Sequence, residues 1–134
     1  MHICLDIDDT ITYAPNFFVG ICNCFSDARI SIVTFRPDLD SARNYLRGIG
    51  LRYHDLIVST DPSRGKLSNE SLHEWKARFV NKLRPDFFFE DMPEVVALID
   101  DDIVVFMPCD PVIRSWIKSK LDASEVATQQ CPLT

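Results

Sequence analysis

Three carboxylates crowd into a short stretch near the start of the chain. The segment LDIDDTIT, residues 5–12, holds Asp6, Asp8 and Asp9 directly after an apolar run at residues 3–5. Acidic side chains at the end of a buried strand repel one another and are costly to bury unless a cation neutralises them. The pattern therefore predicts a site that binds a positive group, and the rest of the chain has to indicate which one.

Apolar runs alternate with helical patterns along the chain. Short apolar runs predict buried strands, and apolar residues at helical spacing predict helices with one buried face. The expected strands are residues 2–7, 30–34, 56–58, 87–89 and 103–106, and the expected helices are residues 15–26, 38–49, 72–83, 93–99 and 111–121. This alternation predicts an α/β fold, a three-layer Rossmann-like domain with a five-stranded parallel sheet. We expect one catalytic domain over residues 1–124 and a flexible tail at residues 125–134.

The carboxyl ends of the expected strands gather the residues best suited to chemistry. In open parallel sheets, binding sites form in the crevice beyond these ends. Thr34 follows the second expected strand, and Glu90 and Asp91 follow the fourth. Lys76 lies on the third expected helix, and Lys66 lies in the loop before it. The acids that follow the first and fourth expected strands are therefore expected to meet the hydroxyl group of Thr34 and a nearby lysine.

This set of side chains suits magnesium and a phosphate group. Mg²⁺ prefers a few carboxylates, several waters and a phosphate oxygen. An aspartate can attack phosphorus to form an aspartyl-phosphate, while a hydroxyl group and a lysine hold the other phosphoryl oxygens. The sequence has neither a His/Cys set at zinc spacing nor an EF-hand loop, so magnesium is favoured over zinc and calcium.

The same residues resemble the motifs of the haloacid dehalogenase superfamily, whose members are mostly magnesium-dependent phosphatases. LDIDDT resembles the DxDxT signature, and the apolar strand that ends at Thr34 resembles the second motif. Lys76 resembles the lysine of the third motif, and Phe89-Glu90-Asp91 resembles the acidic fourth motif. The resemblance covers residues 1–110, and the motifs occur in the order of the family.

The resemblance implies a role for each matching residue. Asp6 is implied to be the nucleophile and a metal ligand. Asp8 is implied to be the general acid and base, with its main-chain carbonyl on the metal.

The other motifs are implied to bind the substrate and the metal. Thr34 and Lys76 are implied to hold the phosphoryl group, with Lys66 as the competing lysine. Asp91 is implied to complete the magnesium site together with Glu90, although Glu90 is equally suited to a structural hydrogen bond.

The chain has no room for the cap domain that superfamily members acting on small metabolites usually carry. The segment between Thr10 and Thr34 is long enough for only one helix and one strand. The segment from Thr34 to Asp91 holds a helix, a strand and a helix, which again leaves no room for a cap. An open site suits a bulky phosphorylated substrate such as a nucleotide, a nucleic-acid end or a large metabolite, unless a second subunit of a homo-oligomer covers it. The segment WK…FFFEDMPEVV resembles the polynucleotide 3'-phosphatase and 5'(3')-deoxyribonucleotidase-like branches. Phe35 departs from the glycine of many relatives and is expected to narrow the space beside the phosphate.

The sequence therefore predicts a Mg²⁺-dependent phosphomonoester hydrolase that works through an aspartyl-phosphate. The alternative is a catalytically decayed module of the same fold that binds or regulates. A formal net charge of −6 argues against a general nucleic-acid-binding surface but not against a local basic cleft. The chain shows no export signal and no membrane-spanning run, and its five cysteines suit a reducing setting, so we expect a cytoplasmic protein that makes no membrane contact.

Several polar and aromatic residues receive a structural interpretation. Asp9 is expected to support the turn, and Asp110 to cap the last helix. Trp75 is expected in the core. For Arg36 two roles stay open, an ion pair with Asp38 and a contact with the substrate.

Overall fold

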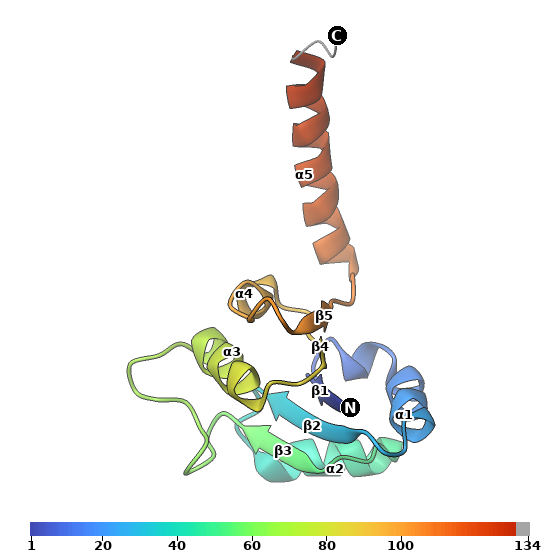
Figure 1. The fold of residues 1–134 in the computed structure, drawn as a ribbon, viewed down its shortest axis with the longest axis vertical. Helices are drawn as coiled ribbons and strands as arrows, with labels where there is room; N and C mark the ends of the chain where they lie inside the picture. The colour runs from blue at the N-terminus through green and yellow to red at the C-terminus, as the bar shows by residue number, and fades with distance from the viewer. Residues whose placement is uncertain (131–134) are drawn as a thin grey trace.

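Five parallel strands form one sheet in the order β3-β2-β1-β4-β5 (Figure 1). The computed structural model describes residues 1–130, with side chains described as far as Ser124. The strands are β1 His2–Leu5, β2 Arg29–Thr34, β3 Asp55–Val58, β4 Phe87–Phe89 and β5 Val104–Phe106. The predicted α/β, Rossmann-like fold is confirmed, because every strand lies where an apolar run predicts one.

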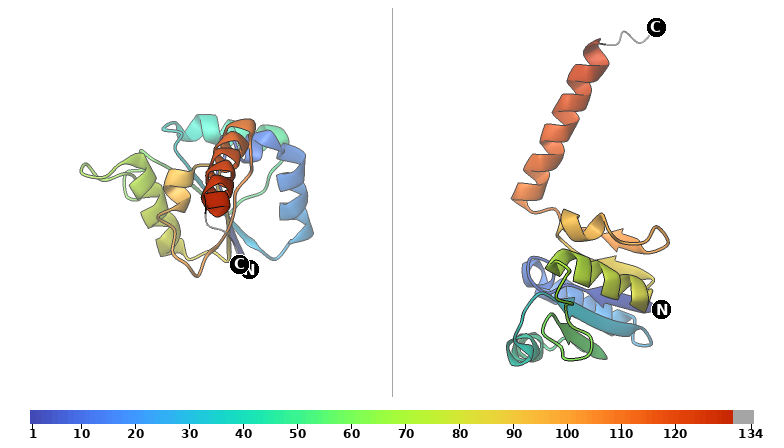
Figure 2. Two further views of the ribbon diagram at one scale, coloured as in Figure 1. Left: turned by 90° about the horizontal axis from the view of Figure 1, so that it is seen from above. Right: turned by 90° about the vertical axis from the view of Figure 1, so that its left-hand side faces the viewer.

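Helices cover both faces of this sheet and make three layers (Figure 2). The helices are α1 Pro15–Cys24, α2 Leu39–Ile49, α3 Leu72–Leu83, α4 Pro93–Val96 and α5 Pro111–Gln130, with a short 3-10 helix η1 at Ile11–Tyr13. Successive residues of a strand point to opposite faces, so Leu5 packs in the core beneath α1 and α2, while Cys4 packs beneath α3 and α4. Leu46 belongs to the first core, and Trp75 and Phe88 belong to the second, each fully buried.

Local sequence signals fix the ends of the middle helices. Asp38 caps α2, because its Oδ1 accepts the main-chain N–H of Asp40 at 2.9 Å. Gly50 ends the same helix with a φ of +72°, a conformation that glycine adopts at little cost. Ser71 caps α3 by accepting the N–H of Glu74. These signals set where α2 begins and ends and where α3, which carries Lys76, begins.

The last helix is longer than the sequence pattern predicts. α5 begins at Pro111 as expected but continues to Gln130 instead of ending near Leu121, since no glycine or proline interrupts residues 112–130. The first part of the expected tail is thus helical backbone, and residues 131–134 lie outside the described residues. Figures 1 and 2 show α5 projecting from the sheet and away from the other helices.

No cap domain is inserted between the described strands, as expected. The segments that join them hold only the helices above and loops, of which the longest runs from residue 59 to residue 71. Over the part of the chain that the structure describes, no helix combines the length and apolarity needed to cross a bilayer.

Candidate active site

Asp6 stands at the carboxyl edge of the middle strand. Leu5, the last residue of β1, is aligned with Ile32 of β2 and Phe89 of β4. Asp6 continues this pairing, because its N–H donates to the Phe89 carbonyl at 3.1 Å. The Asp6 side chain is buried, with 4% of the residue exposed, so its carboxylate has to find its partners inside the protein.

Lys76 is the cation beside this carboxylate. Its Nζ lies 2.5 Å from Asp6 Oδ1 and 3.0 Å from Glu90 Oε1, and the lysine is fully buried. Lys66, the competing residue, lies on an exposed loop and donates to two main-chain carbonyls of its own loop. The fold therefore brings Lys76, and not Lys66, to the acidic residues at the sheet edge.

Asp6, Glu90 and Asp91 form a carboxylate cluster at the ends of β1 and β4. One oxygen from each lies within 4.8 Å of the other two. Glu90 is fully buried, and its Oε1 contacts Lys76 as an ion pair without hydrogen-bond geometry, which leaves that oxygen with no hydrogen-bond partner among the described residues. A donor set made of carboxylates alone suits a hard cation such as Mg²⁺. The three residues are therefore candidate metal ligands.

One lysine does not neutralise this cluster. Burial raises the pKa of Glu90, and Lys76 only partly opposes that shift. Burial and the neighbouring Asp6 carboxylate raise the pKa of Asp91 to about 7. For Lys76, burial acts to lower the pKa, but Asp6 and Glu90 outweigh it and raise the pKa above its usual value. Without a metal the cluster therefore retains protons, which a divalent cation would displace.

Thr10 holds the second oxygen of Asp6. Its hydroxyl donates to Asp6 Oδ2 at 2.9 Å, and the residue is fully buried. Since Lys76 contacts Oδ1 and Thr10 contacts Oδ2, both carboxylate oxygens have fixed positions. The sequence places Thr10 at the carboxyl end of the first expected strand but gives it no role, although its position as the threonine of the DxDxT match could have indicated this contact.

Asp8 does not join the cluster in this structure. Both of its carboxylate oxygens accept from Arg36, at 3.0 Å from Nε and 2.8 Å from Nη2, and the guanidinium also lies over the Tyr45 ring. The expected alternatives for Arg36 were Asp38 or a substrate, and the observed partner is neither. The hydrogen bonds from Arg36 lower the pKa of Asp8 and hold it as a carboxylate.

The end of β2 shapes the other side of the site. Thr34 is buried, and its Oγ1 accepts the N–H of Arg36 at 3.1 Å. Phe35 covers the lysine, because Lys76 Nζ lies 4.4 Å from the centre of the Phe35 ring. The edge of that ring meets His73 of α3. Phe35 therefore contacts the cation of the site.

We predict that Mg²⁺ stabilises the protein more strongly at about pH 8 than at about pH 6. Because the raised pKa values of Glu90 and Asp91 let the metal-free folded state bind more protons than the unfolded chain, stability falls as the pH rises above their ordinary values. Mg²⁺ bound to the deprotonated carboxylates would offset this loss. Thermal unfolding at both pH values, with Mg²⁺ or EDTA, measures the effect, and 1 kcal/mol corresponds to about 4 °C.

Two matched substitutions identify the source of that stabilisation. Asp91→Asn should remove the Mg²⁺-dependent shift in melting temperature. Asp101→Asn, in an exposed acidic turn between α4 and β5, should retain it. Equal melting temperatures with Mg²⁺ and with EDTA at both pH values would mean that the cluster holds no such metal.

Comparison with known proteins finds similarity in structure and not in sequence. No family model matches the chain, and no curated protein matches it. A chain of the "Structure of Pnkp1/Rnl/Hen1 complex" is similar with a TM-score of 0.62 and 10% identity, over 80% of this chain and 45% of that one. A chain of the "Structure of the Pnkp1/Rnl/Hen1 RNA repair complex" is similar with a TM-score of 0.59 and 12% identity, over 80% and 42%. This chain thus spans less than half the length of either solved chain, and at such identities the likeness shows a shared fold.

Proposed function

We propose that this chain is a Mg²⁺-dependent phosphomonoester hydrolase that forms an aspartyl-phosphate on Asp6. The observation that carries the proposal is the convergence of Asp6, Lys76, Glu90 and Asp91 at one end of the sheet. A buried nucleophile with both oxygens oriented, a buried ammonium group and two further acids supply what phosphoryl transfer requires. The order of the motifs along the chain, which resembles that of haloacid dehalogenase phosphatases, supports the same proposal.

The reaction takes place in two displacements at phosphorus. First, an Asp6 carboxylate oxygen attacks phosphorus, the ester P–O bond breaks, and Asp8 gives its proton to the departing alkoxide. Then water attacks the aspartyl-phosphate, Asp8 accepts the proton from that water, and inorganic phosphate leaves with Asp6 restored. Lys76 and Thr34 are proposed to hold the phosphoryl oxygens that do not react.

The metal has a supporting part in this proposal. Asp6, Asp91 and Glu90, with the main-chain carbonyl of Asp8, would hold Mg²⁺. When bound, Mg²⁺ offsets the repulsion between the carboxylates and the anionic phosphate.

Asp8 has to leave Arg36 before it can act as an acid. The guanidinium holds Asp8 as a carboxylate, which suits the second displacement but not the first. A phosphate group entering the site offers Arg36 a competing anion, and release of Asp8 would return its pKa towards the ordinary value. This ion pair is also the observation that favours a second candidate, a phosphate-binding module that does not turn over.

The open edge of the sheet favours a large substrate. No cap domain lies between the described strands, so no inserted domain stands between this edge of the sheet and a phosphate at the end of a long molecule. One of the two similar solved chains comes from a complex that is described as an RNA repair complex. We therefore propose a nucleic-acid end as the first substrate to test, ahead of mononucleotides and phosphosugars.

The test is a substrate panel with Mg²⁺. It contains an aryl phosphate, mononucleotides, phosphosugars and oligonucleotides with a 3'- or 5'-terminal phosphate. We expect phosphate release that EDTA stops and Mg²⁺ restores, with the highest kcat/KM on an oligonucleotide end. Turnover of mononucleotides alone would favour a nucleotidase. Binding of Mg²⁺ and phosphate without turnover of any substrate would favour the binding module.

A further inference from the structure

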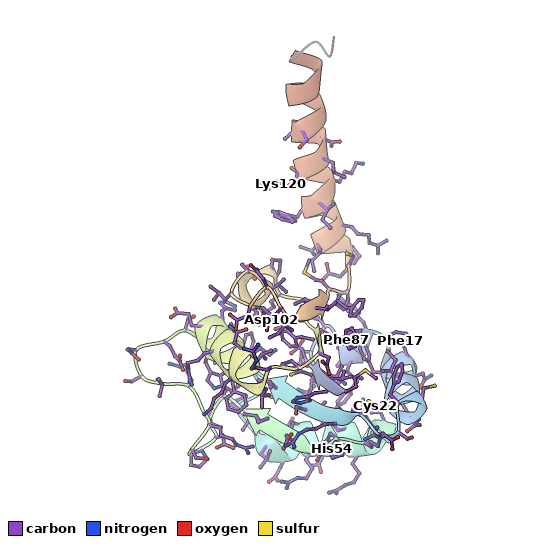
Figure 3. All side chains as sticks on the ribbon, in the orientation of Figure 1. Phe17, Cys22, His54, Phe87, Asp102 and Lys120 are labelled. Carbon is purple, nitrogen blue, oxygen red and sulfur yellow. The ribbon has the colours of Figure 1, made fainter. Side chains whose placement is uncertain are left out.

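On the face of the sheet that α1 covers, α1 does not extend over the edge formed by β4 and β5, and an apolar groove lies there. Phe87 and Phe89 of β4 point to this side, and Phe106 of β5 is aligned with Phe89 and is 47% exposed. With Phe17 of α1 and Phe25, the residue that directly follows α1, they line an apolar groove of about 320 Å³. Figure 3 labels Phe17 and Phe87. Phe17 and Phe25 are themselves 56% and 47% exposed. We call these five phenylalanines the aromatic groove.

The helix that follows β5 carries the complementary surface. Beyond its first turn α5 exposes large apolar side chains, with Trp116 at 53% and Leu121 at 59% exposure. Ile117 lies on the same side of the helix as Leu121, since four residues separate neighbours along one helical face. An exposed apolar helix face and an exposed apolar groove in one chain are costly in water unless each is covered.

The helix cannot cover the groove of its own chain in the observed arrangement. Its first turn is anchored, because Asp110 Oδ1 accepts the N–H of Ile113 at 2.7 Å and Ile113 is buried. Tyr13 donates its hydroxyl to Asp110 Oδ2 at 3.3 Å, which ties the start of α5 to η1. From this anchor α5 runs outward, and Figure 3 places Lys120 on the projecting helix, far from Phe17 and Phe87.

We propose that two copies of this chain exchange α5, so that the helix of each copy lies in the aromatic groove of the other. One two-fold axis then buries both of these surfaces twice, so neither is left exposed to recruit further copies. The charges agree with this arrangement. Lys118 and Lys120 accompany the apolar side chains of the helix. On the groove, Asp86 directly precedes Phe87, and Asp27 lies two residues after Phe25.

The occupant is a second copy, and two other arrangements are outcomes of the test. In one, α5 folds back into the groove of its own chain, and the protein is a monomer. In the other, two α5 helices pair with each other, and the groove does not contribute.

The decisive variants are Phe17→Glu in the groove and Leu121→Glu on the helix, both at exposed positions of the single chain. Leu67→Glu, at an apolar residue that is 54% exposed in the loop before α3, is the matched control.

Light scattering after size exclusion, over a range of concentrations, measures the mass of each protein. We expect a dimer for the wild type and for Leu67→Glu. Each decisive variant should raise the dissociation constant of the dimer about a hundredfold, since each dimer contains the altered contact twice and burial of one large apolar side chain is worth about tenfold. Circular dichroism and the Mg²⁺-dependent melting shift verify that the monomers are folded.

Mixing the two decisive variants tests the exchange itself. One heterodimer contact then joins an intact helix to an intact groove, so the mixture should associate more tightly than either variant alone. A monomeric wild type would overturn the proposal, as would a Phe17→Glu protein that dimerises like the wild type. Two monomeric variants that fail to associate when mixed would also overturn it.

Discussion

The Asp6→Asn protein should hydrolyse an aryl phosphate more than about a thousandfold more slowly than the wild type under saturating Mg²⁺. The amide is not a nucleophile and cannot form the acyl phosphate, so the first displacement stops. Asparagine keeps the size of the side chain and an oxygen acceptor, and Lys76 keeps Glu90 as a partner, so the fold should persist. Steady-state phosphate release and transfer of label from a radiolabelled phosphomonoester to acid-quenched protein measure the loss.

A neighbouring substitution of the same kind supplies the control. Asp9 is exposed and has a φ of +61°, a conformation that asparagine also tolerates. Asp9→Asn should therefore keep both the activity and the labelling. Full activity in the Asp6→Asn protein would exclude Asp6 as the nucleophile, and equal loss in both variants would point to damage of the shared turn.

The elements that position the site are predictable because their signals are local. Apolar runs place the strands, although the first ends at Leu5 and not at residue 7 as expected. Parallel pairing then brings Asp6 and Glu90 to the same edge of the sheet. A capping aspartate and a glycine with positive φ mark the ends of α2, as the sequence indicates. The position of Lys76 follows from helical periodicity, which sets the lysine beside the buried Trp75 on α3.

Local sequence signals do not predict the contacts between side chains at the site. Arg36 pairs with Asp8 from a different strand end, and nothing local distinguishes that partner from Asp38. Phe35 was expected to narrow the site, but its contact with Lys76 depends on how β2 and α3 meet. The start of α5 also makes a tertiary contact that local signals do not predict, since Tyr13 of η1 donates its hydroxyl to Asp110.

The Lys76→Met protein should lose about 3 kcal/mol of free energy of unfolding when no metal is present. Methionine fills a similar volume but leaves the buried carboxylates of Asp6 and Glu90 without the cation that lies 2.5 Å and 3.0 Å from them. Urea denaturation at neutral pH measures the change. Native proteins typically have a free energy of unfolding of ~5–15 kcal/mol, so we expect the variant to stay folded. Phosphatase activity should fall as well, because the lysine is proposed to hold the phosphoryl group.

Two further proteins separate charge from packing in this result. Lys82→Met, at an exposed position of the same helix, should change the free energy of unfolding by less than about 0.5 kcal/mol. Adding Glu90→Gln to Lys76→Met removes one of the unpaired acids and should return part of the lost stability, while activity stays low.

Mg²⁺ should also stabilise Lys76→Met more than the wild type, since the ion then faces carboxylates with no competing ammonium group. If the metal-free Lys76→Met protein were as stable as the wild type, the carboxylates would not depend on this lysine, and burial of the cluster would need another source of positive charge.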